Sequence, residues 1–390
     1  KQLLSHLDAA GITTIAECGG ARFVDPHTVA LEDGTLLQGD KFILCVGGHA
    51  RRLPIAGADL ALTHSDVWSL QSLPRSVAII GAAATGCQLA TILNTFGAEV
   101  HLLDLAPQIL PAEDAMTAEQ VRAAFDRRGV RVLTGIEGVT AIERRNADLI
   151  LHYGAAGEDR ELPVTTVIQA VGWPGNADRL NLDAAGVGTI RSYVQVNDHL
   201  QTSAPHIYAA GDITGRMMLV QSAGYEARIA AENAILGHRQ TYGHHIVPHG
   251  GFTDPEYGSV GLTEATAGEA HSIAVAQVPY ADLDRAVIDD RTEGVCKLIA
   301  ERETGRLLGA HVVGEQALEI VHMVAAGMAS GMTVDQLAAL EIAYPTYTAV
   351  LGLAARRIAA ELGRMTVDPE WRALSRIDGR ALVGEWENRA

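Results

Sequence analysis

The 390-residue sequence contains few cysteines, few aromatic residues and no long apolar run. Cys18, Cys45, Cys87 and Cys296 are scattered, so they form neither a C-x-x-C pair nor a zinc-binding pattern. Scattered thiols favour a reducing compartment, and we expect a cytoplasmic protein. No apolar segment approaches the ~18 residues of a membrane span, so no such span is predicted.

Basic residues are also few compared with acidic ones. The chain has 30 Lys and Arg residues against 47 Asp and Glu residues, and its formal net charge is −17. This surplus of acid disfavours nucleic acid and anionic membranes as partners. Hydrophobic residues (48%) and glycine (40 residues) are abundant, which is typical of a glycine-rich α/β enzyme. The length predicts two or three domains rather than a single core.

Residues 76–104 predict a strand, a tight glycine turn and a helix. The β-branched run 77–80 leads to Gly81, and apolar residues then recur at helical spacing from residue 86. The bare N–H groups at the start of such a helix can bind a pyrophosphate. Ala83 stands where a dinucleotide fingerprint usually has its middle glycine, so we expect phosphate to lie slightly farther out or to be bridged by water.

An acidic residue ends the second strand of this unit. Asp104 lies 23 residues after Gly81, where a carboxylate suits the ribose 2′-hydroxyl of NAD. A 2′-phosphate would meet a like charge there, and residues 105–107 supply no Arg to offset it. The pattern therefore predicts NAD binding with NADH preferred to NADPH. The alternative is an ordinary βαβ unit whose glycines serve packing alone.

The rest of the chain reads as alternating strands and helices. Strands are expected around 13–16, 28–31 and 41–46. From residue 246 on, the pattern becomes antiparallel strands with helices. Thr333 and the glutamine three residues later predict a capping box at a helix start.

Two further strands run directly into glycine, in "KFILCVGG" and "PHIYAAGDITG". In the second, Asp212 follows Gly211, so its carboxylate can accept a hydrogen bond from a sugar or ribityl hydroxyl. A helix is expected from about Met218, and its positive end would favour an anionic group such as N1 of a reduced flavin. The alternative is that Asp212 simply caps this helix.

Six segments in this order resemble the pyridine nucleotide-disulfide oxidoreductases: "FILCVGG", "AIIGAAATGCQLA", "QAVGWPGNADRLNL", "HIYAAGDITG", "FTDPEYGSVGLTE" and "ETGRLLGAHVVG". The resemblance covers nearly the whole chain. It implies an α/β fold with two Rossmann-like domains that bind FAD and NAD, and a C-terminal α+β domain that forms a homodimer. The implied boundaries are 1–71 and 173–245 for FAD binding, 72–172 for NAD binding, 246–365 for dimerisation and 366–390 for a tail.

The resemblance also implies the cofactor contacts. FAD would be held by residues of the two FAD-binding segments: Ala21, Val46, Gly47, Gly48, Asp212, Met218, Leu219, Val220 and Gln221. The nicotinamide nucleotide would be held by Gly81, Ala82, Ala83, Ala84, Thr85, Gly86, Cys87, Gln88, Asp104, Ile136 and Gly172.

The sequence departs from the family's pattern in four places. Tyr344 stands where most disulfide-reducing members have an acid/base His, and Ala349 stands where they have its Glu partner. Ala84 replaces the aromatic that gates the nicotinamide pocket, and Gln88 replaces a glutamate of the same helix. The family's first glycine fingerprint and its C-x-x-x-x-C pair belong before Lys1, so we expect that an N-terminal segment is missing.

These departures favour one function and leave two alternatives open. The favoured protein is an FAD-dependent enzyme that passes hydride from NADH to flavin, then electrons to a small-molecule acceptor such as a quinone, a dye or a second nucleotide. Tyr344, which stands at the family's His position, would be the candidate catalytic residue. A tyrosine is a poor proton shuttle for thiols at neutral pH, which disfavours dithiol chemistry. The alternatives are a disulfide or metal-ion reductase with cysteines before Lys1, and an inactive nucleotide-binding subunit. No metal site is expected at His244, His245 and His249.

Overall fold

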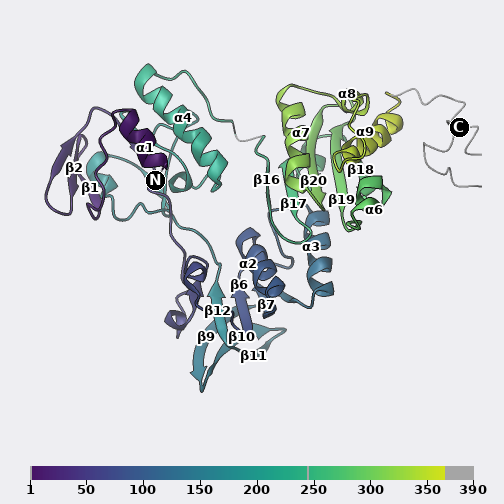
Figure 1. Ribbon diagram of the computed structural model, residues 1–390. Helices are drawn as coiled ribbons and strands as arrows, with labels where there is room; N and C mark the ends of the chain where they lie inside the picture. Colours follow the sequence, from purple (N-terminus) through teal and green to yellow (C-terminus); the bar gives the residue numbers. More distant parts are fainter. Residues whose placement is uncertain (1, 244–245, 365–390) are drawn as a thin grey trace, which may run out of the picture. The chain divides into compact units, whose positions relative to one another are not determined.

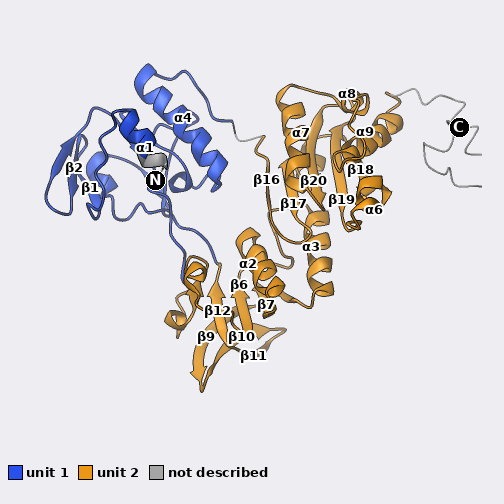
Figure 2. Ribbon diagram, in the orientation of Figure 1, with its two compact units in different colours: residues 1–52, 171–244 blue, residues 53–170, 245–390 orange. Residues whose placement is uncertain are grey.

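The computed structural model describes residues 2–243 and 246–364. The chain forms two compact units (Figure 2): residues 1–52 with 171–244 make unit 1, and residues 53–170 with 245–390 make unit 2. Each unit therefore takes two separate stretches of the sequence.

Some sequence expectations fall outside this description. His244, His245 and the tail expected at 366–390 lie outside the described residues. The domain boundaries implied by the resemblance remain predictions.

Unit 1 begins with helix α1 (Gln2–Ala9) and a small antiparallel sheet (Figure 1). The sheet has the order β1-β2-β3, with strands Ala21–Asp25, Thr28–Leu31 and Leu36–Gln38. Phe23 is buried, and its ring meets that of Phe42 edge-on at 5.2 Å between centroids. This aromatic pair anchors the sheet to the rest of the unit.

A parallel strand pair joins the two stretches of unit 1. β4 (Phe42–Leu44) pairs with β15 (Ile207–Ala209), and α4 (Val220–Leu236) packs on both strands. β13 (Thr189–Ile190) and β14 (Tyr193–Val194) form a hairpin between them in sequence. The strands expected at 28–31 and 41–46 are thus confirmed, although β4 is shorter than expected.

The strand expected at 13–16 is wrong. Among the described residues, 12–20 belong to no strand, and residues 11–17 are exposed. β-branched residues favour a strand where a neighbouring strand pairs with them and a core covers one face. This segment has neither partner nor cover in unit 1, so its local preference is not realised.

The first half of unit 2 is a parallel sheet of five strands in the order β5-β12-β6-β7-β8. Their bounds, in that order, are Leu62–Thr63, Thr166–Gln169, Ser76–Ile80, Glu99–Asp104 and Arg131–Thr134. All five residues of β6 are buried, as an apolar run in a parallel strand predicts. Helices α2 (Ala84–Thr95) and α3 (Ala115–Arg127) connect β6 to β7 and β7 to β8.

An antiparallel sheet interrupts this parallel one before its last strand in sequence. It has the order β11-β10-β9, with bounds Glu158–Val164, Asp148–Ala155 and Gly138–Arg145. β10 pairs antiparallel with both β9 and β11.

The second half of unit 2 is an antiparallel sheet in the order β16-β17-β20-β19-β18. Its strands are His249–Gly251, Tyr257–Gly261, Leu307–Val313, Val295–Glu301 and Ile273–Pro279. Its helices are α5 (Glu264–Ala270), α6 (Asp284–Ile288), α7 (Ala317–Ala329), α8 (Val334–Ala338) and α9 (Ala349–Glu361). Figure 1 shows α7 beside β17 and β20, and α9 beside β18 and β19, and these contacts bury one continuous apolar cluster.

The expected capping box begins α8. The side chain of Thr333 accepts a hydrogen bond from the helix backbone, and the Thr333 N–H donates to Gln336 Oε1 at 2.9 Å. This prediction is confirmed because the motif is local. Among the described helices, none combines the length and apolarity that crossing a membrane requires.

Candidate functional site

The turn between β6 and α2 needs glycine at two places. Gly81 has a φ of 103°, which L side chains rarely adopt. A Cβ atom on Gly86 would lie 1.8 Å from the carbonyl oxygen of Gly81. Gly86 therefore serves close packing of the helix on the turn, the role that the third glycine of a dinucleotide fingerprint has.

The start of α2 offers free backbone donors. Its N-cap residue, Ala83, makes no side-chain cap, so the first N–H groups of the helix have no side-chain acceptor. Ala83 is exposed, and its methyl group therefore clashes with nothing in the turn. This set of donors fits an anionic pyrophosphate, as the sequence predicts.

Asp104, at the end of β7, is held against the same turn. Its Oδ2 accepts a hydrogen bond from the N–H of Ala82 at 2.6 Å, and its Oδ1 accepts one from the N–H of Ala106 at 2.8 Å. The backbone N–H of Ile136 donates to the backbone carbonyl of Asp104 at 3.2 Å, so Ile136 lies next to Asp104. Each carboxylate oxygen keeps a lone pair, so the fixed carboxylate fits two ribose hydroxyls.

The thiol in this turn is inert. Cys87 is fully buried, and its Sγ donates to the Ala82 carbonyl at 3.3 Å. Burial, with a smaller contribution from the Asp104 charge, raises the pKa of the Cys87 thiol well above its ordinary range. A nucleophilic role is therefore disfavoured, and Cys87 packs α2 onto the sheet.

Unit 2 brings together most residues expected at the nicotinamide nucleotide. Gly81 to Gln88 form the turn and the first helical turn of α2, and Asp104 and Ile136 lie next to it. Gly172 belongs to unit 1, where its carbonyl accepts from the N–H of Arg51 at 3.1 Å.

A second glycine turn, in unit 1, carries Asp212. Gly211 has a φ of 78° and directly precedes the short 3-10 helix Asp212–Thr214. The N–H of Gly211 donates to Oε2 of Glu226 at 2.6 Å. Glu226, on α4, is fully buried, and burial raises the pKa of its carboxyl above the ordinary value. A hydrogen bond to the buried carboxyl of Glu226 therefore holds the backbone of this turn in place.

Trp173 is a residue of this site that sequence reasoning missed. Its indole Nε1–H donates to Oδ2 of Asp212 at 2.8 Å. A Cβ atom on Gly48 would lie 2.6 Å from that same nitrogen, so Gly48 leaves room for the indole. The available signal was an aromatic residue directly after the glycine of "AVGWPGN".

The other residues expected at FAD belong to the same unit. Val46, Met218 and Val220 are exposed although apolar, and Val220 is 91% exposed. Gly47 has a φ of 63° and open space beside it, and Ala21 is the first residue of β1. α4 begins without a side-chain cap at Leu219, and Gln221 lies in its first turn. Exposed apolar side chains, a carboxylate and the positive end of a helix in one unit fit a flavin with its ribityl chain.

Tyr344 lies in the loop between α8 and α9 of unit 2, and it is 54% exposed. Ala349, which stands at the family's Glu position, is the first residue of α9. An exposed hydroxyl can donate or accept one hydrogen bond, and Ala349 supplies no carboxylate to assist it.

A polar cluster links the start of α3 to the C-terminal sheet of unit 2. Glu113 Oε1 lies 3.2 Å from His249 Nε2, and Glu113 Oε2 accepts from the Ser259 hydroxyl at 2.6 Å. Burial opposes ionisation of Glu113, but hydrogen bonds from His249 and Ser259 outweigh it and hold the pKa of Glu113 below its ordinary value. Next to it, buried Lys297 bridges Asp114 at 2.7 Å and Glu264 at 2.6 Å. The cluster links the parallel-sheet half of unit 2 to its antiparallel-sheet half. No local sequence pattern predicts this role, because the partners are far apart in sequence.

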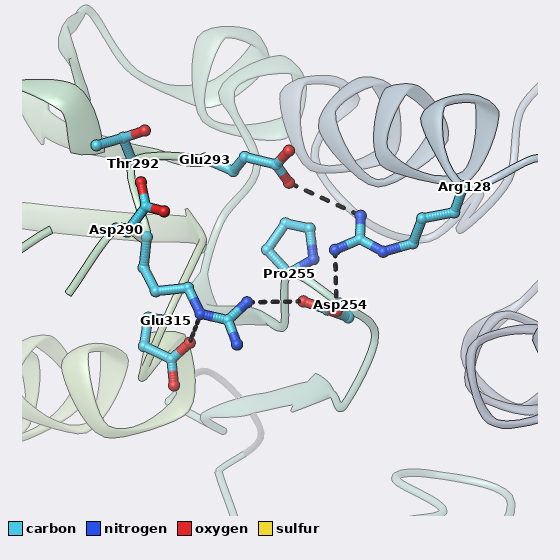
Figure 3. Close-up of a pocket in the computed structure, with 8 residues that line it drawn as sticks. Arg128, Asp254, Pro255, Asp290, Thr292, Glu293 and Glu315 are labelled. Carbon is cyan, nitrogen blue, oxygen red and sulfur yellow. Dashed lines mark ion pairs between the residues drawn. The ribbon is translucent and has the colours of Figure 1, made fainter. Parts of the chain in front are cut away.

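A charged cavity of about 280 Å³ lies in the same unit (Figure 3). Arg128 pairs with Asp254 at 2.9 Å and with Glu293 at 3.7 Å, and Arg291 pairs with Asp254 at 3.8 Å and with Glu315 at 3.9 Å. Both arginines are thus paired with carboxylates of the cavity wall. We interpret these ion pairs as links between neighbouring segments of unit 2 rather than as a cofactor site. Within the described residues there is no group of three or more His, Cys, Asp or Glu side chains that could hold a metal ion.

Comparisons with known proteins agree with this arrangement. The family model described as pyridine nucleotide-disulphide oxidoreductase matches residues 6–227, and the model of that family's dimerisation domain matches residues 247–355. The resemblance and the fold class stated from the sequence are therefore confirmed.

Individual relatives are similar over most of the chain. A dihydrolipoyl dehydrogenase of Thermus scotoductus is 32% identical over 338 residues, which cover 84% of this chain and 72% of the relative. A mercuric reductase of Lysinibacillus sphaericus is 30% identical over 352 residues, covering 89% of this chain and 64% of the relative. Among solved structures, the HOCl-induced flavoprotein disulfide reductase RclA of Escherichia coli has a TM-score of 0.82 at 25% identity, covering 91% of this chain and 82% of that one. The same reductase has been solved as a Cu(II) complex.

Proposed function

Because the chain belongs to the pyridine nucleotide-disulphide oxidoreductase family, we propose that it reduces a disulfide or a metal ion at the expense of NADH. Family membership makes it an FAD-dependent oxidoreductase with FAD and NAD as cofactors. The acceptor is the proposed part. Its support is that the similar proteins are named as dihydrolipoyl dehydrogenase, mercuric reductase and flavoprotein disulfide reductase. This is the first of the two alternatives that the sequence left open.

The observation that carries the nucleotide half of the proposal is the turn at Gly81. Free N–H groups at the start of α2 would hold the pyrophosphate, and the fixed Asp104 carboxylate would hold the adenosine ribose. The Asp104 carboxylate would repel the 2′-phosphate of NADPH, because no side chain in residues 105–107 is positive and could offset that repulsion. These residues orient the coenzyme and select NADH.

The flavin half rests on the turn at Asp212. Asp212 would accept a hydrogen bond from a ribityl hydroxyl, and the positive end of α4 would favour negative charge on the ring. When bound, FAD supplies a ring that takes hydride from NADH and passes electrons on. The apolar side chains of Met218 and Val220 would exclude water from that ring.

Thiol chemistry would need cysteines other than those seen here. All four, Cys18, Cys45, Cys87 and Cys296, are free, and the last two are buried. These four cysteines, as placed here, form no redox-active pair that could reduce a disulfide or a metal ion. Free thiols support a reducing compartment, and we place the protein in the cytoplasm. The dimerisation domain at residues 247–355 supports a homodimer.

Tyr344 favours a second candidate, the direct transfer of electrons from flavin to a quinone, a dye or a second nucleotide. A tyrosine hydroxyl ordinarily titrates near pH ~10, so it is a poor acid/base group for thiols at neutral pH. For a direct acceptor, Tyr344 need only donate one hydrogen bond or shape the pocket.

Steady-state kinetics of wild type and Tyr344→Phe separate the two candidates. NADH oxidation is measured with a quinone, with lipoamide, with glutathione disulfide and with a divalent metal ion. Fast turnover of a disulfide or the metal ion supports the first candidate, and turnover of the quinone alone supports the second. In the second case the loss of the hydroxyl should cost about fivefold in rate, or about 1 kcal/mol. Turnover with none of the acceptors contradicts both.

A further inference from the structure

The backbone of Trp173 is held by pairing with an earlier segment of unit 1. Residues 172–176 run antiparallel to residues 46–51, with an isolated bridge between Gly48 and Gly175. The His49 N–H donates to the Pro174 carbonyl at 3.0 Å, and the Asn176 N–H donates to the Gly47 carbonyl at 3.0 Å. These bonds fix the position from which the indole reaches Asp212.

A second aromatic residue supports this placement. The hydroxyl of Tyr193, on β14, donates to the backbone carbonyl of Trp173 at 2.9 Å. The ring of Tyr193 lies so close to Gly215 that a Cβ atom there would be 2.6 Å away. Tyr193 therefore ties the Trp173 backbone to the end of the turn that carries Asp212.

We propose that Trp173 is a positioning residue for the flavin: its indole N–H holds Oδ2 of Asp212 and leaves Oδ1 for the ribityl hydroxyl. The proposal rests on Asp212 as the flavin ligand in the proposed function. An indole is a donor only, so it orients the carboxylate without competing for the hydroxyl as an acceptor. A hydrogen bond to a charged acceptor is also stronger than one between neutral groups.

Asp104 shows how a carboxylate is oriented when no side chain donates a hydrogen bond to it. That carboxylate is held by two backbone N–H groups, whereas no backbone N–H donor to the Asp212 carboxylate is found among the described residues. Trp173 thus supplies the orientation that the backbone supplies at Asp104. Removal of its N–H should leave the Asp212 carboxylate free to rotate.

The test is Trp173→Phe, which keeps an aromatic ring and removes the donor. The flavoprotein is stripped of FAD and titrated with FAD, and the dissociation constant is read from flavin fluorescence. We expect about tenfold weaker binding, which corresponds to about 1.4 kcal/mol. Trp68→Phe is the matched control, because Trp68 is 85% exposed and lies in unit 2, and its affinity should equal that of wild type.

A double-mutant cycle with Asp212→Asn tests the pairing itself. If Trp173 acts through Asp212, Trp173→Phe should weaken FAD binding by less than a further twofold in a protein that already carries Asp212→Asn. Full additivity of the two losses would overturn the proposal. So would an unchanged FAD affinity in Trp173→Phe. An unchanged affinity in Asp212→Asn would instead overturn the flavin site of the proposed function, and the two failures are thereby distinguished.

Trp173→His guards against a folding defect in the Phe variant, because it keeps a ring N–H donor. Its FAD affinity should stay within about threefold of wild type, less than the loss expected when a hydrogen bond to a charged group is removed. A loss as large as that of Trp173→Phe would show that ring size rather than the donor matters, and the proposal would fail. Thermal unfolding of each apoprotein reports on the fold independently of FAD.

Discussion

The two glycine turns place the same kind of group by different means. Asp104 ends the buried strand β7, Asp212 follows the buried strand β15, and both carboxylates fit a sugar hydroxyl. Asp104 is oriented by the N–H groups of Ala82 and Ala106, both close in its own βαβ unit. Asp212 is oriented by Trp173, which lies 39 residues earlier in sequence. A carboxylate held by backbone is therefore protected from most substitutions, whereas one held by a side chain depends on a single distant residue.

The largest expected effect comes from breaking the first turn at its closest contact. In Gly86→Ala the new Cβ atom would meet the Gly81 carbonyl oxygen at 1.8 Å, and that oxygen belongs to backbone that cannot rotate away. We expect a loss of about 3 kcal/mol or more in the free energy of unfolding, with weaker NADH binding. Thermal and denaturant unfolding measure the loss.

Gly224→Ala is the matched control from the other unit. Gly224 is a helical glycine of α4 with nothing within 4 Å of a new Cβ atom. The substitution should stabilise the protein by up to about 1 kcal/mol, because alanine favours a helix over glycine. Equal effects of the two substitutions would refute the packing role of Gly86.

A medium effect should come from removing the carboxylate of the first turn. Asp104→Ala removes the ribose acceptor and the repulsion of a 2′-phosphate together. The ratio of kcat/KM for NADH to that for NADPH should fall about tenfold, or by about 1.4 kcal/mol. Asp126→Ala, which removes an exposed carboxylate paired with Arg122, should leave the ratio unchanged. A wild type that prefers NADPH would contradict the assignment of Asp104.

The smallest effect concerns the buried acid beneath the second turn. The folded-state pKa of Glu226 lies above its ordinary value of 4.5 because burial disfavours the charged form. The folded protein therefore holds this proton more tightly than the unfolded chain does, and stability falls as pH rises from 4.5 through the folded-state pKa.

Glu226→Gln should remove that fall, because the amide oxygen can still accept from Gly211 and cannot ionise. The melting temperatures of variant and wild type should converge near pH ~4 and separate in favour of the variant by pH ~8. A separation of the opposite sign at alkaline pH would show that the carboxylate charge stabilises the turn.

Local patterns predicted the first turn better than the second. Gly97, with a φ of 101°, directly follows Phe96, the C-cap of α2, and Thr333 forms the capping box that the sequence predicts. Both features depend on residues within one turn of helix. The bond between Trp173 and Asp212 depends on strand pairing across more than one hundred residues, so no local spacing announces it. The strand expected at 13–16 was wrong for the same reason, because β structure needs a partner that sequence preference does not supply.

The division of unit 1 into two stretches affects the order in which the protein folds during synthesis. β4 leaves the ribosome before its partner β15, which is encoded about 160 residues later. Meanwhile β6, α2 and β7 are contiguous and can form their parallel pair at once. At about 5–20 residues per second, β4 and its exposed apolar neighbours wait on the order of ten seconds for β15. Chaperone capture of the nascent chain is therefore expected in that interval, on unit 1 rather than on the nucleotide turn.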